Sequence, residues 1–488
     1  MIHAPSIHYL AILPELIFLG ASFALLLAAG LNRKVLSATT GAALTTVAGL
    51  ATIIVNFIQW HDVAQHGATV TIAKAVIQDG FSVVATGVIA VGSILSAWVM
   101  RDYLARDRHR ATEFFVLALS AAAGAILMVQ ANDLIVVFLG LEILSLGLYV
   151  LVGFDRRRSG SNEAALKYFL LGGFASALFI YGAALLYGAT GTTSLTGISY
   201  FLSANAVLRP GLLAAGAILL LVALAFKVAA APFHMWSPDT YEGAPTPVTG
   251  FMAAIVKVGA LAVLLRLFLM SLPTQTDLWH PVLYVIVIAT LVVGSLVGLV
   301  QRNIKRLLAY SSINHAGFIL LGLFAGGARG VQGSLYYLMT YVPVVIATFA
   351  IVTVVGGRGD TNHDLTAYRG LARRQPVLGG TLALLLLVQA GAPFTTGFFA
   401  KLSVITAAVS DGGVVVSVIA MAAAAAAGYY YLRTVLSLFA ADDPFGEPVA
   451  VPVGSASVIA LGASSAVIFG VWTGPLVALA HHATLLLP

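Results

Sequence analysis

The chain contains 488 residues, of which 60% are hydrophobic and only 9% are charged. Soluble domains usually contain about 45–50% apolar and about 25% charged residues, so this composition excludes a water-soluble globular enzyme. The net charge is +6, but 25 Lys and Arg are too few over this length to form a nucleic-acid-binding surface. With 0 Cys, the sequence also excludes disulfides, thiolate zinc sites and cysteine-ligated iron–sulfur clusters.

Fourteen apolar runs are long enough to cross a membrane as helices, since a span needs roughly 20 apolar residues. The runs are continuous and do not alternate with polar residues, which excludes a transmembrane β-barrel. In chain order, the predicted spans cover residues 7–29, 35–59, 81–100, 112–130, 134–152, 163–188, 211–231, 246–270, 279–300, 304–326, 333–355, 377–409, 413–439 and 455–479.

The distribution of Lys and Arg between the loops predicts the orientation of the chain. Loops after odd-numbered spans hold seventeen of these residues, whereas loops after even-numbered spans hold only Lys74, Arg209 and Arg329. Because basic loops stay in the cytoplasm, the odd-numbered loops should face the cytoplasm and both termini should lie on the outer side. Lys167 and Arg266 lie near span ends, from which their charges should reach the interface.

Five titratable side chains fall near the half depth of five different predicted spans. An ionisable group in the membrane interior costs at least about 2.5–3.5 kcal/mol, so each is a candidate functional residue. Lys257, for example, lies ten residues after Pro247, which corresponds to about 15 Å along a helix. The five residues are Glu142, Lys227, Lys257, His315 and Lys401. Together they predict one hydrophilic layer along the middle of the membrane.

Each candidate has a structural alternative. Glu142 and one lysine could form an inert pair between helices, and His315 could simply hydrogen-bond a neighbouring Ser. His234 follows a proline at a span end, and it is either a further site or an ordinary interfacial histidine. Three lysines and one glutamate cannot all pair off, which favours a function for Lys257 and Lys401.

Two predicted spans combine a proline with a lysine. Lys227 precedes Pro232 in ALAFKVAAAPFHMW at 223–236, and Pro393 precedes Lys401 in LVQAGAPFTTGFFAKLS at 387–403. A proline inside a helix removes a backbone hydrogen bond, and in lipid such a break needs protein or water to supply other partners. Discontinuous helices near the midplane are typical of ion pathways, whereas the alternative is an ordinary proline kink.

These features predict an all-α polytopic membrane protein with two inverted five-helix repeats, each containing a broken helix. Spans 4–8 and 9–13 form two blocks of five, and the odd number inverts the second block in the membrane. The second helix of each block carries a mid-depth group, and the fourth is the broken lysine helix. The predicted parts are an N-terminal three-helix segment at 1–110, repeats at 111–271 and 272–440, and a C-terminal helix at 441–488.

Three stretches resemble a known family. They are AFKVAAAPFHMWSPDTYEGAPTPVTGFMAAIVKVG at 225–259, NIKRLLAYSSINHAGF at 303–318 and QAGAPFTTGFFAKLSV at 389–404. The chain resembles the antiporter-like membrane subunits of respiratory complex I and the related multisubunit cation/proton antiporters. Within that family it is most similar to the N-type subunits. M-type subunits usually have Glu where this chain has Lys401, and the long extension of L-type subunits is absent.

The resemblance implies a proton-translocating, non-redox subunit in the membrane arm of a proton-translocating NADH–quinone oxidoreductase. Its partners would be other membrane-arm subunits and the lipid bilayer of a bacterial inner membrane, with no nucleic acid. By position, the resemblance implies that a carboxylate on the fifth helix pairs with a lysine on the seventh helix. It also implies a central lysine on the eighth helix and a terminal lysine on the twelfth. These positions are Glu142, Lys227, Lys257 and Lys401; His315 falls where many members have His, and His234 matches the PFH turn.

The resemblance also implies that this chain holds no metal and no cofactor. NADH, FMN, iron–sulfur clusters and quinone are expected in other subunits, and the chain has no Gly-rich phosphate motif. A Na⁺/H⁺ antiporter subunit is the main alternative because it shares the lysines. The five buried titratable groups argue against a purely structural spacer. A haem subunit would need paired histidines in the bilayer, and of 11 His only His315 lies in mid-span.

Overall fold

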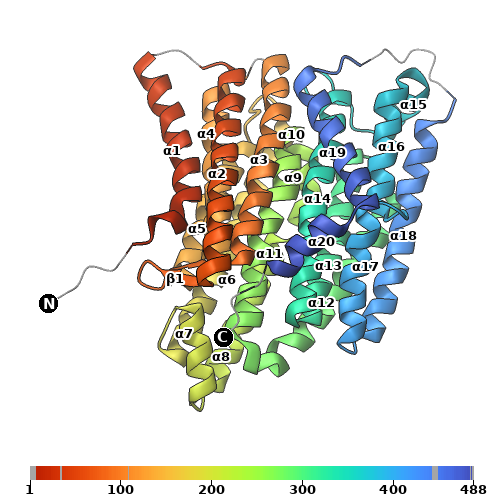
Figure 1. The fold of residues 1–488 in the computed structure, drawn as a ribbon. Coiled ribbons are helices and arrows are strands. Elements are labelled where there is room, and N and C mark those ends of the chain that lie inside the picture. Colours follow the sequence, from red (N-terminus) through yellow and green to blue (C-terminus); the bar gives the residue numbers. More distant parts are fainter. Residues whose placement is uncertain (1–6, 33–35, 108, 442–448, 484, 486–488) are drawn as a thin grey trace.

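The protein is described by a computed structural model that covers residues 7–32, 36–107, 109–441, 449–483 and 485. Val35, with which the second predicted span begins, and the two chain termini lie outside these residues. Within them, 13 helices are long and apolar enough to cross a membrane. Figure 1 shows the long helices standing side by side in one bundle, which confirms the all-α polytopic fold.

The elements follow the predicted spans closely. The N-terminal part comprises α1 (Tyr9–Asn32), α2 (Ala38–His66), the hairpin β1 (Thr69–Thr71) and β2 (Val76–Gln78), and α3 (Gly80–Asp107). The next part comprises α4 (Ala111–Gln130), α5 (Leu134–Val152), α6 (Ser159–Thr190), α7 (Leu195–Ala204), α8 (Pro210–Lys227), α9 (Trp236–Gly243), α10 (Thr246–Phe251) and α11 (Lys257–Leu265).

The remaining helices are α12 (Thr276–Leu296), α13 (Ile304–Ala325), α14 (Gly327–Val355), α15 (Leu371–Arg374), α16 (Pro376–Ala390), α17 (Thr396–Ser410), α18 (Val414–Leu438), α19 (Val453–Val471) and α20 (Gly474–His482). Single π-helical turns, η1 (Met252–Val256) and η2 (Arg266–Ser271), flank α11. Short 3₁₀ turns are η3 (Pro273–Gln275), η4 (Val297–Val300) and η5 (Leu365–Tyr368).

Both proline–lysine spans are interrupted. The seventh predicted span ends as a helix at Lys227, and Ala229 then adopts a φ of 58° before Pro232. The freed backbone groups find side-chain partners, because the Trp236 indole donates to the Phe226 carbonyl at 2.9 Å. The twelfth predicted span divides into α16 and α17 around Pro393. These two halves are each too short to span, so the 13 long helices and this broken one account for fourteen predicted spans.

The fourteenth predicted span is shorter than the sequence indicated. Instead of one helix over 455–479, α19 ends at Val471 and α20 starts at Gly474 with Pro475 in its first turn. The proline lacks the amide hydrogen that a continuing helix uses, and it is favoured in the first turn of a new helix. Figure 1 shows α20 lying obliquely across the bundle, where it packs on α14 and α3.

Helices α4 and α5 show how small residues bring spans together. A Cβ added at Gly124 would lie 2.5 Å from the Leu144 amide nitrogen and 2.7 Å from the Gly140 carbonyl oxygen. A Cβ added at Gly140 would lie 2.9 Å from the Gly124 carbonyl oxygen. The two helices therefore approach backbone to backbone, as expected where lipid gives no hydrophobic force for packing.

We expect Gly124→Ala to destabilise the protein by about 1–3 kcal/mol, because the new methyl group meets rigid backbone and must push α5 away. The thermal unfolding midpoint of the purified protein measures this effect. Gly20→Ala in α1 is the matched control, because a Cβ there has no neighbour within 4 Å. An equal midpoint for Gly124→Ala and the control would contradict the close approach of α4 and α5.

Candidate functional site

Lys257 is buried at the start of α11, directly after the π-helical turn η1. Its Nζ donates a hydrogen bond of 2.6 Å to the carbonyl oxygen of Ser312 on α13. The Ser312 hydroxyl lies 3.1 Å from the Tyr241 hydroxyl, and the Tyr341 hydroxyl donates to it at 3.2 Å. π-helical turns are frequent at functional sites because they re-aim the side chains that follow them. The ammonium of Lys257 is therefore directed at a polar patch of α13.

His315 lies one turn further along α13 and is also buried. Its Nδ1 is hydrogen-bonded to the Tyr337 hydroxyl at 2.6 Å, and its Nε2 lies 3.3 Å from the Tyr431 hydroxyl. The Tyr431 hydroxyl in turn lies 2.5 Å from the Ser311 hydroxyl. Both ring nitrogens thus have hydroxyl partners from other helices, α14 and α18. The neighbouring serine reaches His315 only through Tyr431.

Lys401 lies on α17 and points back to the end of α16. Its Nζ donates to the carbonyl oxygens of Gln389 at 2.9 Å and Ala390 at 2.7 Å. In an unbroken helix, the Gln389 carbonyl would accept from the amide of residue 393, but Pro393 has no amide hydrogen. The break therefore creates the acceptors that hold this buried ammonium. The C-terminal end of α16 also carries the negative end of its helix dipole.

Helix α13 joins the surroundings of Lys257 and Lys401. Ser311 and Ser312 are adjacent on this helix; Ser312 holds Lys257, and the Ser311 hydroxyl donates to Gln389 Oε1 at 3.3 Å. Gln389 is the residue whose carbonyl accepts from Lys401. The structure thus gathers three of the five predicted mid-depth residues around α13. Lys257 bonds to the Ser312 carbonyl, whereas the Ser311 hydroxyl contacts the partners of His315 and Lys401.

Lys227 is buried at the last residue of α8 and contacts α5 and α6. Its Nζ donates to the Ser145 hydroxyl at 2.6 Å, and it lies 5.4 Å and 5.5 Å from the ring centres of Tyr149 and Tyr168. Aromatic faces attract a cation through their quadrupoles. Hydroxyl and ring contacts therefore replace the direct carboxylate pair that the resemblance implied.

Glu142 is half-buried on α5, one helical turn before Ser145. The Ser176 hydroxyl of α6 donates to Glu142 Oε1. No ion pair within 4.0 Å joins Glu142 to Lys227 among the described residues. Because Glu142 and Ser145 occupy one face of α5, the lysine nevertheless contacts the same stretch of helix. The structure places the two charges near each other, with Ser145 as the direct partner of the lysine.

His234 lies in the turn between α8 and α9, apart from the hydrogen-bonded group around α13. Its ring centre is 6.5 Å from that of Tyr310, and its buried Nδ1 has no hydrogen-bond partner among the described residues. Burial lowers its pKa from the usual value, so the neutral ring is favoured. These contacts give His234 no direct link to Lys227 or Lys257.

One buried ion pair was missed from the sequence. Arg266 does not reach the interface, as its place near a span end had suggested, and is fully buried in η2. Its guanidinium forms two hydrogen bonds of 2.8 Å to the Asp79 carboxylate, while Nε donates to the Val129 carbonyl at 2.9 Å. The planar fork of Arg suits a bidentate carboxylate. The one feature of the sequence that pointed to this pair is Asp79, the acidic residue just before the third predicted span, 187 positions from Arg266.

A second buried cluster surrounds Asp360 at the other end of the bundle. The carboxylate accepts hydrogen bonds from the Thr246 amide at 2.9 Å and hydroxyl at 2.7 Å. It also lies 3.2 Å from Arg158, 3.2 Å from His363 and 3.7 Å from the buried Lys305 at the start of α13. Burial alone would raise the pKa of Asp360, but these partners hold that pKa well below its usual range.

We expect Asp360→Asn to destabilise the protein by about 3–5 kcal/mol, because it leaves Lys305 buried without its anion. Asp411→Asn, at an exposed carboxylate after α17, should leave the thermal midpoint unchanged. The lowered pKa means that the stabilisation is present at neutral pH and is lost only as pH falls below the usual range of Asp. If the midpoint of wild type falls between pH 7 and pH 5 while that of Asp360→Asn does not, this assignment is wrong.

The sequence of the chain is similar to those of known proteins. Residues 131–427 match the family model described as NADH:quinone oxidoreductase/Mrp antiporter, TM. The NADH-quinone oxidoreductase subunit N of Mycobacterium tuberculosis is 44% identical over 383 residues, which cover 77% of this chain and 72% of that protein. The protein of the same name from Chloroflexus aggregans is 40% identical over 413 residues, 84% of each chain.

Solved structures share the fold. A chain of respiratory complex I from Thermus thermophilus with bound aureothin superposes with a TM-score of 0.80 at 33% identity, over 96% of this chain and 99% of that one. A chain of the Mrp complex from Dietzia has a TM-score of 0.84 over 96% of this chain and 97% of that one. At 20% identity, that likeness shows the fold alone.

Proposed function

This chain belongs to the NADH:quinone oxidoreductase/Mrp antiporter family, and we propose that it moves protons across the membrane arm of an NADH–quinone oxidoreductase. The observation that carries the proposal is that Lys257, His315 and Lys401 gather around α13, where Ser312 accepts from Lys257 and Ser311 contacts the partners of the other two residues. The name subunit N, shared by relatives at 40–44% identity, favours this complex over a Na⁺/H⁺ antiporter.

The chemistry of the proposal follows from the contacts of the buried lysines. An ammonium in the membrane interior is costly, and among the described residues the direct hydrogen-bond acceptors of the three lysines are neutral. A small change in the distance to a charged partner therefore shifts the balance between ammonium and amine. The hydroxyl groups and the imidazole of His315 near Lys257 and Lys401 are able to both accept and donate a proton. The group has the composition of a proton relay.

Glu142 and Lys227 would form the input of the relay. Lys227 is held by Ser145 and two aromatic rings, while Glu142 is held by Ser176. If the carboxylate swings toward the lysine, the ammonium form gains stability, and if it swings away, the proton is released. Quinone reduction in another subunit is the proposed source of this movement. The half-buried position of Glu142 leaves it open to a charge on a neighbouring subunit.

Other expectations from the sequence remain part of the proposal. We propose that this chain holds no redox site, metal or cofactor, and that electron transfer takes place in partner subunits. We also propose a bacterial inner membrane with both termini outside, on the basis of the loop charges. We further propose that His234 is a lower-ranked site residue and that spans 4–8 and 9–13 form two inverted repeats. The interrupted lysine helix in each block supports the repeats.

We expect Lys257→Arg and Lys401→Arg to lower proton transport nearly as much as the alanine variants do. Arg keeps the positive charge but does not release its proton at accessible pH. The measurement is proton uptake by the assembled complex in sealed vesicles, normalised to NADH oxidation. The expected loss is on the order of tenfold or more, as for removal of an acid–base group.

Lys167→Arg is the control for these variants. Lys167 is bound to Glu163 and Asp239 at 2.7 Å and 2.8 Å, so a permanent positive charge should serve there equally well. Full proton transport with Arg at position 257 would mean that the central lysine is a fixed charge, and the relay would have to be abandoned. Copurification with NADH-oxidising subunits separates this proposal from the antiporter alternative.

We expect Glu142→Gln to impair proton transport while the complex still assembles. Gln keeps the shape and accepts the Ser176 hydrogen bond but removes the charge that acts on Lys227. Ser176→Ala is the control, because it removes the hydrogen bond and retains the carboxylate. The same vesicle assay compares the two. Near-normal transport in Glu142→Gln, with a defect in Ser176→Ala, would indicate that Glu142 has only a packing role.

A further inference from the structure

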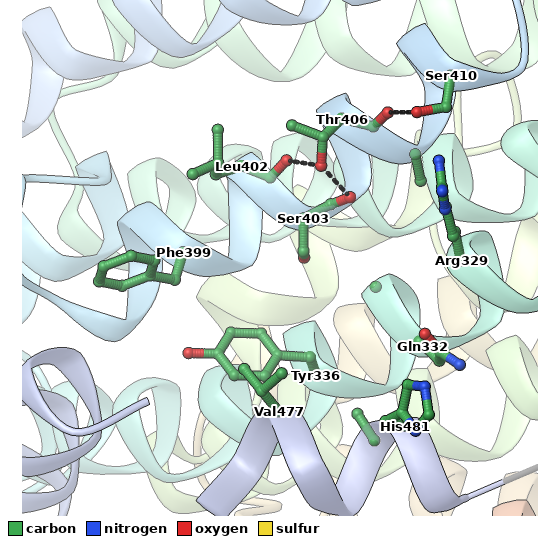
Figure 2. A pocket seen from close by; sticks show the side chains of 13 residues that line it. Arg329, Gln332, Tyr336, Phe399, Leu402, Ser403, Thr406, Ser410, Val477 and His481 are labelled. Carbon is green, nitrogen blue, oxygen red and sulfur yellow. Dashed lines mark hydrogen bonds between the residues drawn. The ribbon is translucent and has the colours of Figure 1, made fainter. Parts of the chain in front are cut away.

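A pocket of about 450 Å³ lies between α14, α17 and α20. From its shape and its hydrogen-bond donors, we infer that it binds the phosphate headgroup and first acyl carbons of an anionic phospholipid. Figure 2 shows Arg329, Gln332 and His481 gathered at one end of this pocket and Phe399 at the other. Such a site would act in anchoring the oblique helix α20.

Four hydrogen-bond donors of the pocket have no partner among the described residues. They are the guanidinium of Arg329, the amide of Gln332, the ring of His481 and the hydroxyl of Tyr336. Tyr336 is the most telling, because its side chain is only 3% exposed and its hydroxyl is buried without a hydrogen bond. Buried polar groups are normally paired, so this one indicates an acceptor that the chain does not supply. Arg329, Gln332 and His481 lie together at one end of the pocket, where they match a phosphate group, whereas the Tyr336 hydroxyl points toward the Phe399 end.

The hydroxyl groups that α17 contributes to the pocket are already hydrogen-bonded within their own helix. Ser403, Thr406 and Ser410 donate to carbonyl oxygens of their own helix, at 2.8–3.0 Å. The side-chain hydroxyls that α17 contributes are therefore already used within that helix, and the charge on the pocket comes from Arg329 of α14. A headgroup bound there would be clamped between α14 and α20. This clamp would explain why a helix with the sequence GPLVALAHH stays packed obliquely against the bundle.

The pocket changes from polar to apolar with depth, as a lipid does. Arg329 lies in the first turn of α14, and Tyr336 lies seven residues further in, about 10 Å along the helix. On α17, Ser410 is the last residue and Phe399 lies eleven residues further in, about 16 Å. The deep end is lined by Phe399 and Leu402, with Val477 of α20 across from them. A free phosphate ion would make no favourable contact with these apolar side chains, whereas an acyl chain would.

The charge pattern of the chain supports the same occupant. Arg329 is one of only three Lys or Arg residues in the even-numbered predicted loops, where the other two are Lys74 and Arg209. Positive residues are rare on the outer side of a membrane protein, and a lipid phosphate is an anion that would complement one lining a pocket there. Acidic side chains do not line the pocket. The headgroup phosphate at the bilayer surface is the anion available at this depth.

The test uses the assembled complex in lipid nanodiscs with phosphatidylglycerol that carries a photoreactive group on its acyl chain. A phosphate-free glycolipid with the same acyl chain is the matched probe. We expect phosphatidylglycerol to label peptides that contain Phe399, Leu402 or Val477. Arg329→Gln should reduce this labelling about tenfold, as expected for loss of one charge-assisted hydrogen bond. Arg209→Gln, at another exposed cation outside the pocket, should leave it unchanged.

Each other outcome would overturn the inference. Equal labelling by the glycolipid would mean that the pocket does not recognise phosphate. Displacement of the bound lipid by an equal concentration of inorganic phosphate would identify a free-anion site. Absence of labelling, combined with reduced proton transport in Tyr336→Phe, would indicate a water-filled proton outlet. If Arg329→Gln does not assemble, the wild-type competition between the two lipid probes decides the question alone.

Discussion

The structure depends on one constraint, which is that every ammonium in the membrane interior must be given hydrogen-bond acceptors. An uncompensated charge there costs at least about 2.5–3.5 kcal/mol, and continuous helices offer few free acceptors because their carbonyls bond to their own amides. Lys401 meets this requirement through the broken end of α16. Pro393 cannot donate to the Gln389 carbonyl, and Lys401 donates to that carbonyl at 2.9 Å. The proline and the lysine are therefore two parts of one feature.

The other break uses the same chemistry with different partners. At the end of α8, the freed Phe226 carbonyl accepts from the Trp236 indole, and the Ala231 amide donates to the Thr290 hydroxyl at 2.9 Å. Lys227 is thus left to bind the Ser145 hydroxyl and the rings of Tyr149 and Tyr168. A lysine held by one hydroxyl and two rings has no fixed anion. This distinguishes its surroundings from those of Lys401, which two carbonyls hold.

Helix α13 is the element that makes these separate sites into one group. It is buried along its whole length, so its polar side chains face other helices and not lipid. Its start is fixed by the Asn303 cap and by Lys305 beside Asp360, while its middle presents Ser311, Ser312 and His315. Charged contacts at the end of the helix therefore hold the hydrogen-bonded residues in register. Because the pair of Asp360 and Lys305 is buried, removal of either residue would leave the other charge unpaired, which makes this end of α13 costly to move.

The sequence by itself determined the membrane class and the approximate positions of the spans, because hydropathy and helical rise are local properties. It also located both broken lysine helices from Pro232 and Pro393. It did not distinguish these prolines from Pro14, Pro281 and Pro343, which lie inside intact helices. That difference comes from the side chains that neighbouring helices offer to the freed backbone.

Only the tertiary structure decided which charges meet. Arg266 and Asp79 are 187 positions apart, and no local pattern shows that they pair. Similarly, the partners that surround Lys257, His315 and Lys401 are Ser311, Ser312, Gln389 and Tyr431, uncharged residues with no unusual cost in a span. Composition and spacing identify a buried charge because it is expensive. They do not identify its neutral partners, which become visible only when helix packing brings them within hydrogen-bond distance.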